Sequence, residues 1–327
     1  MRYRGRAAQL ALVLGIVSAA AALAGCSSPA AAVPVTVTIA TGSPTGVYFP
    51  LGTSLAGIYS ARLPGIVGKA IETGASPANV EVLESGGADV AFALGDTAYI
   101  AYTEGTRQNP APHRRLRAIA VLYSNAIHFF VPAGSRIRSL RDLSGARLAY
   151  GVATVAGGRS RSIDLLLQAH GVDPATVQVG PARIDDVVAG LQAGTLDVGV
   201  FSAGFPVPAL DAAARAGLRF LDVDAEALER VREEYPFFVP VAIPPGTYAA
   251  QTQAIETVGV DNVLLCREDL DEDLVYRLTR TFFEALPDLA ATHPSAGLID
   301  ADLAAAAAIP LHAGAARYYR ERELLVY

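Results

Sequence analysis

Two short segments combine glycine and hydroxyl residues in a pattern suited to binding a small anion. They are Gly42-Ser43-Pro44-Thr45-Gly46 and the stretch from Ala153 to Ser160, which contains Thr154 and Gly157-Gly158-Arg159. Each follows a run typical of a strand and precedes a run with helical spacing. Glycines let the main chain approach a ligand, and the N–H groups at a helix N-terminus can bind a carboxylate. A plain strand-to-helix turn is the alternative for both segments.

Arg159 would add a charged, forked hydrogen-bond donor to the second segment. It falls in the first turn of the expected helix, where the helix dipole mildly disfavours a positive charge. That placement favours an anion nearby, and a solvated arginine is the alternative. Neither segment is a phosphate-binding loop of the Walker type, because no Gly-Lys-Ser or Gly-Lys-Thr follows.

The remaining reactive residues do not form a catalytic or metal-binding pattern. No two histidines share a helix face at the spacing of metal ligands, and no Gly-x-Ser-x-Gly sequence is present. We therefore expect no catalytic residue, no bound metal and no cofactor. His128 lies inside an apolar run and is expected to be a core histidine with its hydrogen bonds satisfied. The full set is His113, His128, His170, His293 and His312.

The two cysteines, Cys26 and Cys266, have different surroundings. Arginines at positions 2, 4 and 6 precede an apolar run from 10 to 23, which has the length of a signal-peptide core. The sequence Leu23-Ala24-Gly25-Cys26 then resembles a bacterial lipobox. We expect a signal peptide over 1–25, lipidation of Cys26 and a tether over 26–34. An ordinary secretory signal with a chance cysteine is the alternative. Cys266, in an apolar run, is expected to be a buried small side chain.

Length and charge limit the function further. About 300 of the 327 residues remain after the expected leader, enough for two lobes with their own cores. No second run is long enough to span a bilayer. The chain has 26 basic and 32 acidic residues; without the three leader arginines the balance is 23 to 32, a net charge of −9. Such an acidic chain argues against binding nucleic acid. A local anion site stays possible.

Helical and strand patterns alternate along the chain, which predicts an α/β fold with largely parallel sheets. Ser76-Pro77 is expected to begin a helix, with Ser76 as the N-cap. Strands are expected at 35–40, 69–73, 89–94, 116–123, 127–132, 147–152, 177–179, 197–201 and 218–223. Helices are expected from 51 and from 76, and at 96–103, 139–143, 160–170, 184–193 and 209–216.

One pattern occurs twice, about a hundred residues apart. Residues 83–90 and 191–198 both follow Leu-x-x-Gly-x-x-Asp-Val. The pattern is typical of a helix that ends at glycine, a tight turn and a strand entering a sheet. Two copies indicate two lobes of similar construction, and a cleft between lobes is a usual ligand site.

Seven segments carry a resemblance to a known family: 41–52, 73–80, 86–91, 96–99, 137–145, 243–248 and 310–319. In their order and spacing they resemble the TAXI-type solute-binding subunits of TRAP transporters. Most of the chain after Val35 takes part in the resemblance. Two positions depart from the family pattern: Ala156-Gly157-Gly158-Arg159 stands in place of a Gly-Ser-Gly-Thr type loop, and Leu94 in place of a glutamine.

The resemblance implies a two-lobed periplasmic-binding-protein fold of type II and no enzymatic activity. It implies capture of a small carboxylate, such as glutamate or 2-oxoglutarate, and delivery to TRAP permease subunits in the membrane. The protein would be extracytoplasmic and held at the membrane by lipid on Cys26. Lobe 1 would comprise 35–130 and 243–327 and lobe 2 131–242, with hinges near 130–132 and 238–240. The implied ligand-binding residues are Ser43, Thr45, Gly46, Tyr48, Ser76, Asn79, Asp96, Thr154, Gly157, Gly158 and Arg159.

Two other interpretations stay open at this point. A receptor with the same fold could serve an ABC transporter or a two-component sensor. An extracytoplasmic enzyme on the same fold is the third, disfavoured by the missing catalytic pattern.

Overall fold

The computed structural model describes residues 34–44, 46–150, 160–181 and 184–323. Residues from Thr36 onward form one compact unit. Within it, the elements of the first lobe alternate from the start of the chain. They are β1 (Val35–Ala40), α2 (Tyr48–Arg62), β2 (Ile66–Ile71), α3 (Ser76–Glu84), β3 (Val90–Leu94) and α4 (Gly95–Thr103).

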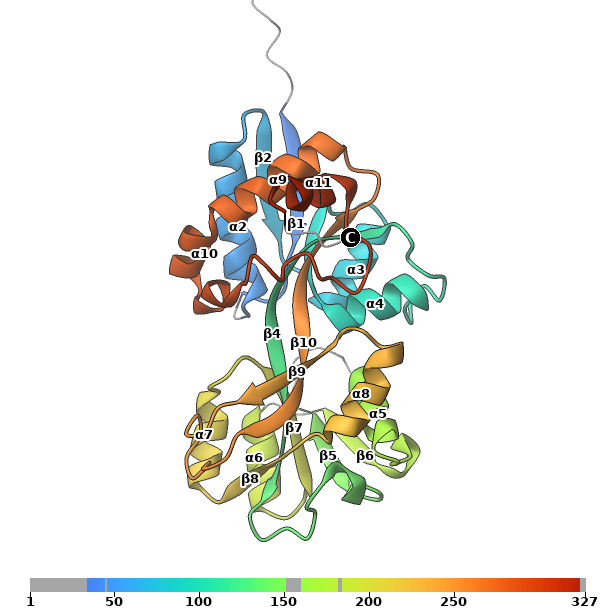
Figure 1. The fold of residues 1–327 in the computed structure, drawn as a ribbon, viewed down its shortest axis with the longest axis vertical. Coiled ribbons are helices and arrows are strands. Elements are labelled where there is room, and N and C mark those ends of the chain that lie inside the picture. Colours follow the sequence, from blue (N-terminus) through green and yellow to red (C-terminus); the bar gives the residue numbers. More distant parts are fainter. Residues whose placement is uncertain (1–33, 45, 151–159, 182–183, 324–327) are drawn as a thin grey trace, which may run out of the picture. The chain divides into compact units, whose positions relative to one another are not determined.

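The long strand β4 (Leu116–Pro132) leads from the first lobe into the second (Figure 1). The second lobe then alternates in the same way. Its elements are η1 (Leu140–Asp142), β5 (Arg147–Tyr150), α5 (Arg161–Ala169), η2 (Pro174–Thr176), β6 (Gln178–Pro181), α6 (Ile184–Gln192), β7 (Val198–Ala203), α7 (Pro208–Arg215), β8 (Leu218–Leu221), α8 (Ala225–Glu234) and β9 (Phe238–Ile243).

A second long strand, β10 (Ile255–Arg267), returns to the first lobe beside β4 (Figure 1). Four helical segments then complete that lobe. They are α9 (Glu272–Glu284), α10 (Leu286–Thr292), η3 (Pro294–Leu298) and α11 (Ala313–Glu321).

The strands form one hydrogen-bonded path in the order β2-β1-β3-β10-β4-β7-β5-β6, with β8 on β4 and β9 on β10. β1 and β3 are parallel, as are β5 with β6 and β5 with β7. β10 and β4 run antiparallel to their neighbours at the centre. The two ends mirror each other: β2-β1-β3 followed by antiparallel β10, and β6-β5-β7 followed by antiparallel β4. The fold class expected from the sequence, two lobes with mostly parallel sheets flanked by helices, is confirmed.

The repeated sequence pattern has the same structural role in both lobes. Gly86 and Gly194 adopt positive φ angles of 78° and 70°, which glycine accepts without strain. Asp89 Oδ2 then accepts the main-chain N–H of Thr38 at 2.8 Å. Asp197 Oδ2 accepts that of Arg147 at the same distance. Each aspartate therefore ties the entry of one strand to the first strand of its lobe.

Each lobe has its own buried core. Tyr59, Phe92 and Phe282 belong to the core of the first lobe, under α2, α9 and α11. Phe129 and Phe238 belong to the core of the second. Cys266 is fully buried in β10, as expected. His128 is 1% exposed, and its ring nitrogens contact the Phe201 carbonyl and the Tyr248 hydroxyl. The expectation of a satisfied core histidine is confirmed.

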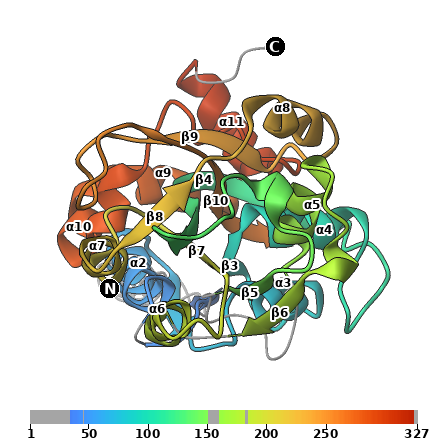
Figure 2. The same cartoon turned by 90° about the horizontal axis from the view of Figure 1, so that it is seen from below.

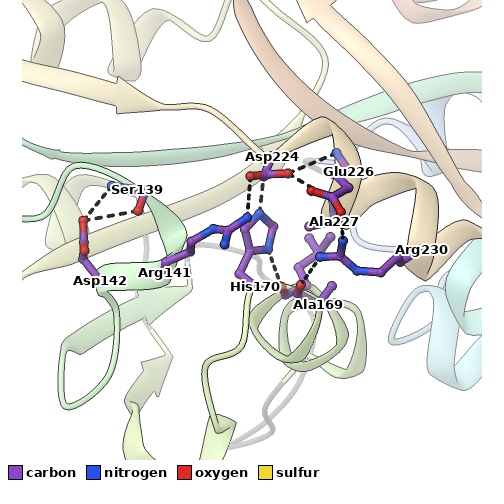
Figure 3. A network of polar contacts seen from close by, with 10 residues as sticks. Ser139, Arg141, Asp142, Ala169, His170, Asp224, Glu226, Ala227 and Arg230 are labelled. Carbon is purple, nitrogen blue, oxygen red and sulfur yellow. Dashed lines mark hydrogen bonds and ion pairs between the residues drawn. The ribbon is translucent and has the colours of Figure 1, made fainter.

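A polar network in the second lobe joins α5 to the start of α8 (Figure 3). His170 Nδ1 contacts the Leu166 carbonyl at 2.6 Å, and its Nε2 accepts the N–H of Asp224 at 3.1 Å. Asp224 caps α8 through the N–H groups of residues 226 and 227 and pairs with Arg141 at 2.8 Å. His170 must be neutral to accept this N–H.

Two local expectations are wrong. Ser76 is the first residue of α3, and Ala75 is the N-cap, with φ of 62°. The strands expected at 116–123 and 127–132 are one continuous strand, because the main chain of Ser124 and Asn125 pairs with Asp261 and Val260 of β10. The polar side chains interrupt the apolar pattern without interrupting the main-chain hydrogen bonds.

Candidate functional site

A pocket of about 290 Å³ opens where the lobes meet beside β4 and β10. The first lobe contributes the end of β1 and the starts of α2 and α3. The second contributes the end of β7. The lining residues are Gly42, Ser43, Gly46, Val47, Tyr48, Ala75, Ser76, Leu94, Tyr123, Asn125, Ser202, Ala203, Gly204, Asn262 and Ser295.

Four of the residues implied by the family resemblance line this pocket: Ser43, Gly46, Tyr48 and Ser76. Ser76 also accepts the main-chain N–H of Leu94 through Oγ at 3.0 Å, which ties the start of α3 to the end of β3. Cys26, Thr45, Thr154, Gly157, Gly158 and Arg159 lie outside the described residues.

Asn79 does not line the pocket. It is fully buried, and its Nδ2 donates to the carbonyls of Thr41 and Phe92, while the Thr73 hydroxyl donates to its Oδ1. These bonds hold the ends of β1 and β3 together below the pocket. The structure thus gives Asn79 a supporting position and no surface toward a ligand.

Asp96 does not line this pocket. It lines an adjoining pocket of about 250 Å³, which shares Ser76 and Leu94 with the first. The Ser162 hydroxyl of the second lobe donates to its Oδ2, and the Thr97 main-chain N–H donates to Oδ1. Burial raises the pKa of the Asp96 carboxyl, although these hydrogen bonds oppose the shift. On the same side, Tyr99 O–H donates to the Glu234 carbonyl at 3.2 Å. Figure 2 shows α4 and α5 on this side of the molecule.

Three helices begin at the pocket. α2 starts at Tyr48, α3 at Ser76, and Leu94 is the N-cap of α4. The N-cap side chain makes no capping hydrogen bond in any of the three. α4 has Asp96 in its first turn, which accepts the N–H of Thr97, whereas α2 and α3 have no acidic residue there. Their first N–H groups and dipoles favour a negative charge. Among the described residues, the lining contains no charged side chain.

Two tyrosines and two asparagines form the floor of the pocket. Tyr48 O–H donates to Asn262 Oδ1 at 2.6 Å. Asn262 Nδ2 donates to the Tyr123 carbonyl at 2.8 Å and to Asn125 Oδ1 at 3.2 Å. Burial raises the pKa of both Tyr48 and Tyr123, so both hydroxyls stay protonated and can donate hydrogen bonds. The floor is therefore neutral. The Tyr48 hydrogen and both amide hydrogens of Asn262 are used within it, so the Tyr123 hydroxyl and the Asn125 amide are its donors toward the pocket.

The main-chain conformation of Ala75, in the wall of the pocket, is also typical of a binding site. Its φ of 62° is unusual for a residue with a β-carbon. Such strain persists where the surrounding structure holds it, and it clusters at binding sites. Here the strained residue lies at the turn between β2 and α3 and itself lines the pocket.

Sequence reasoning missed Asn125, Asn262, Ser202 and Ser295. Asn125 and Asn262 each interrupt a long apolar run with a polar pair, at 124–125 and 261–262. Buried polar groups need partners, so such pairs in core strands are a usable signal. Ser202 and Ser295 offered no comparable signal.

The described residues contain no group of three or more His, Cys, Asp or Glu side chains placed to hold a metal ion. Within the same described ranges, no helix is both long and apolar enough to cross a membrane.

Solved structures with a similar fold are distant in sequence. XAC2383 from Xanthomonas citri, bound to chloride, is 14% identical with a TM-score of 0.51, over 88% of this chain and 95% of that one. The periplasmic aliphatic sulphonate binding protein SsuA from Escherichia coli is 17% identical with a TM-score of 0.45, over 90% and 94%. A TctC solute binding protein from Polaromonas is 15% identical with a TM-score of 0.48, over 79% and 87%. The family model described as "NMT1-like family" matches residues 39–322.

Proposed function

We propose that this chain, which belongs to the NMT1-like family, is an extracytoplasmic receptor that binds a small anionic solute and delivers it to a membrane transporter. It is not an enzyme on this proposal. The observation that carries it is the uncharged pocket at the starts of α2 and α3, lined by residues of both lobes. A ligand held by both lobes can stabilise their closed arrangement, which a transporter can recognise.

The solute is a small carboxylate, with glutamate and 2-oxoglutarate as the first candidates. Helix N-termini and neutral hydroxyl and amide donors can hold a carboxylate without a charged partner. The wall contributed by Ser43, Gly46, Tyr48 and Ser76 supports this choice. Thr45, Thr154 and Gly157-Gly158-Arg159 are proposed to complete it.

The strands β4 and β10 are proposed to carry the movement between lobes. Residues 126–132 pair with β7 and β8, and Ile243, Tyr248 and Ile255 pack in the core of the second lobe. These contacts support crossing points near 123–125 and 261–262. They do not support the hinges expected at 130–132 and 238–240, nor lobe boundaries at 130/131 and 242/243.

The partner on this proposal is a TRAP permease of the TAXI type, and the receptor is tethered beside it by lipid on Cys26. The sequence resemblance supports both statements. The gene neighbours test the first, because an integral permease without an ATPase accompanies a TRAP receptor and an ATPase accompanies an ABC receptor. Metabolic labelling with a fatty acid, compared between the natural chain and Cys26→Ser, tests the second.

Native mass spectrometry of the purified protein tests the function. We expect a bound acidic molecule of small mass. After its removal, glutamate or 2-oxoglutarate at 100 times its Kd should stabilise the protein by about 2.7 kcal/mol. Absence of any retained solute, together with no thermal shift from either carboxylate, would refute the carboxylate receptor.

A further inference from the structure

We infer that Asn125 recognises the charged group of the solute, and that a fixed hydrogen-bond relay from Tyr48 through Asn262 sets its side chain as a donor. The inference rests on the proposed function, because it concerns the same pocket. It adds a specificity-determining residue that the family resemblance did not supply.

The orientation of the Asn262 amide is fixed by a partner that can only accept hydrogen bonds. The Tyr123 main-chain carbonyl can only accept, so the atom of Asn262 that lies 2.8 Å from it must be the amide nitrogen Nδ2. The oxygen Oδ1 of Asn262 therefore faces the other way, where Tyr48 O–H donates to it at 2.6 Å. Asn262 is 1% exposed, and reversing its amide would leave buried groups without partners.

The second N–H of Asn262 Nδ2 fixes the next residue. It points to Asn125 at 3.2 Å, so Asn125 must present its oxygen there. The Asn125 amide nitrogen is consequently directed away from Asn262. Across the described part of the chain, no hydrogen bond of Asn125 Nδ2 is seen, and the half-buried side chain lines the pocket. Both N–H groups are thus available to a ligand.

The strand geometry supports this direction. Tyr123 and Asn125 are two apart on β4 and both line the pocket, as expected for one face of a strand. The pairing of β4 with β10 is irregular between Asp261 and Val263. Such irregularities re-aim a side chain and are common beside binding sites. Here the irregularity lies at Asn262, the middle residue of the relay.

Because the Asn125 amide can only donate toward the pocket, it restricts which chemical groups can bind there. The group bound at Asn125 must be a hydrogen-bond acceptor, and the helix N-termini of α2 and α3 favour a negative one. The chemical class is therefore an ionised oxyanion, such as a carboxylate or a sulfonate. An ammonium or amide N–H presented at this point would face the Asn125 donors and be rejected.

Asn125→Asp tests the inference, because it keeps the shape and replaces the donor by a charged acceptor. Ligand-free protein is titrated with glutamate, 2-oxoglutarate, ethanesulfonate and inorganic phosphate, and with uncharged glutaramide. The natural chain should bind at least one oxyanion more tightly than glutaramide. Asn125→Asp should weaken that oxyanion by about 10- to 100-fold, the loss expected for a hydrogen bond to a charged group. The preference should shift toward glutaramide.

Asn109→Asp is the matched control, because it adds the same charge at a half-buried loop position outside the pocket lining. It should leave all affinities unchanged. If Asn125→Asp does not fold by circular dichroism, Asn125→Ser serves, and it should weaken the oxyanion without favouring glutaramide.

Unchanged oxyanion binding by a folded Asn125 variant would overturn the inference and leave the receptor function standing. Equal binding of glutaramide and the oxyanions by the natural chain would overturn both the inference and the proposed preference for an anionic solute. If no oxyanion binds, the inference and the proposed carboxylate receptor both fail.

Discussion

Tyr48 O–H donates to Asn262 Oδ1 at 2.6 Å, although 214 positions separate the two residues. The bond joins the first turn of α2 to the centre of β10. The Tyr48 ring also stacks on Phe92, with centroids 5.3 Å apart and an interplanar angle of 25°. The start of α2 and the strand β10 are therefore held together, which favours a preorganised binding site.

Tyr48→Phe should weaken ligand binding, because it removes the hydroxyl that orients Asn262 and keeps the stacked ring. We expect a loss of about 1 kcal/mol in the free energy of unfolding, measured by denaturant titration. The affinity for the retained solute should fall with it. Tyr276→Phe is the control, since its hydroxyl donates to Glu321 on the surface and neither residue lines the pocket. Equal effects of both variants on affinity would contradict the relay.

The contact between Asp96 and Ser162 should stabilise the association of α4 with α5. Ser162→Ala leaves the half-buried Asp96 carboxylate with only its bonds from Thr97, so it should lower the unfolding free energy by about 1–2 kcal/mol. The double variant with Asp96→Asn should lose less than Ser162→Ala alone, because no unpaired charge is left. Denaturant titration of the full cycle measures this coupling, and simple additivity would contradict it.

Much of this fold could be predicted from the sequence, because periodicity and turn residues are local signals. The echoed glycine and aspartate at 86–89 and 194–197 predicted two similar lobes, and they occupy equivalent turns. An interruption in the apolar pattern led to a wrong prediction, because the polar pair at 124–125 indicated the end of a strand. The main-chain pairing with β10 that makes the strand continuous depends on residues more than 130 positions away.

The site residues that could be predicted from the sequence lie in the turns between strands and helices or at the first residue of a helix. Ser43, Gly46, Tyr48 and Ser76 lie on segments whose composition singles them out. Asn79 has the residue type of a ligand contact, yet tertiary packing uses its Nδ2 for two main-chain carbonyls and its Oδ1 for the Thr73 hydroxyl. The role of Asn125 depends on its hydrogen bond with Asn262, and no local sequence pattern shows that these two distant strands lie side by side.

Asp197 belongs to the sequence pattern that occurs in both lobes. Asp197→Asn should change how the free energy of unfolding depends on pH. Hydrogen bonds from the Arg147 side chain hold the pKa of Asp197 below its ordinary value. Because the folded-state pKa is lower than the unfolded one, the stabilisation is present above the unfolded pKa and is lost as the pH falls through the folded pKa. The variant should be less stable by up to about 1 kcal/mol at pH 7, since the pair is partly exposed. The difference should shrink below about pH 4, and a constant difference in acid unfolding curves would contradict this.

His128 should make the protein sensitive to mild acid. Burial lowers its pKa to about 4, against an ordinary value of 6.5. The unfolded chain therefore binds a proton between pH 6.5 and 4 that the folded protein does not, and stability falls as the pH is lowered through this window. Relative to His128→Gln, the natural chain should lose about 2 kcal/mol between pH 7 and pH 5. His170 and His312, whose pKa values burial also lowers, are present in both proteins and cancel. Parallel curves of unfolding free energy against pH would contradict the assignment.

A crystal structure of the protein with its retained solute, or with glutamate or 2-oxoglutarate added, tests the central claim most directly. We predict a small anion in the pocket between the starts of α2 and α3 and the strands β4 and β10. One of its oxygens should accept a hydrogen bond from Asn125 Nδ2, while Asn262 keeps its bond from Tyr48. A solute bound elsewhere, or one that presents an N–H group to Asn125, would contradict this account of the site.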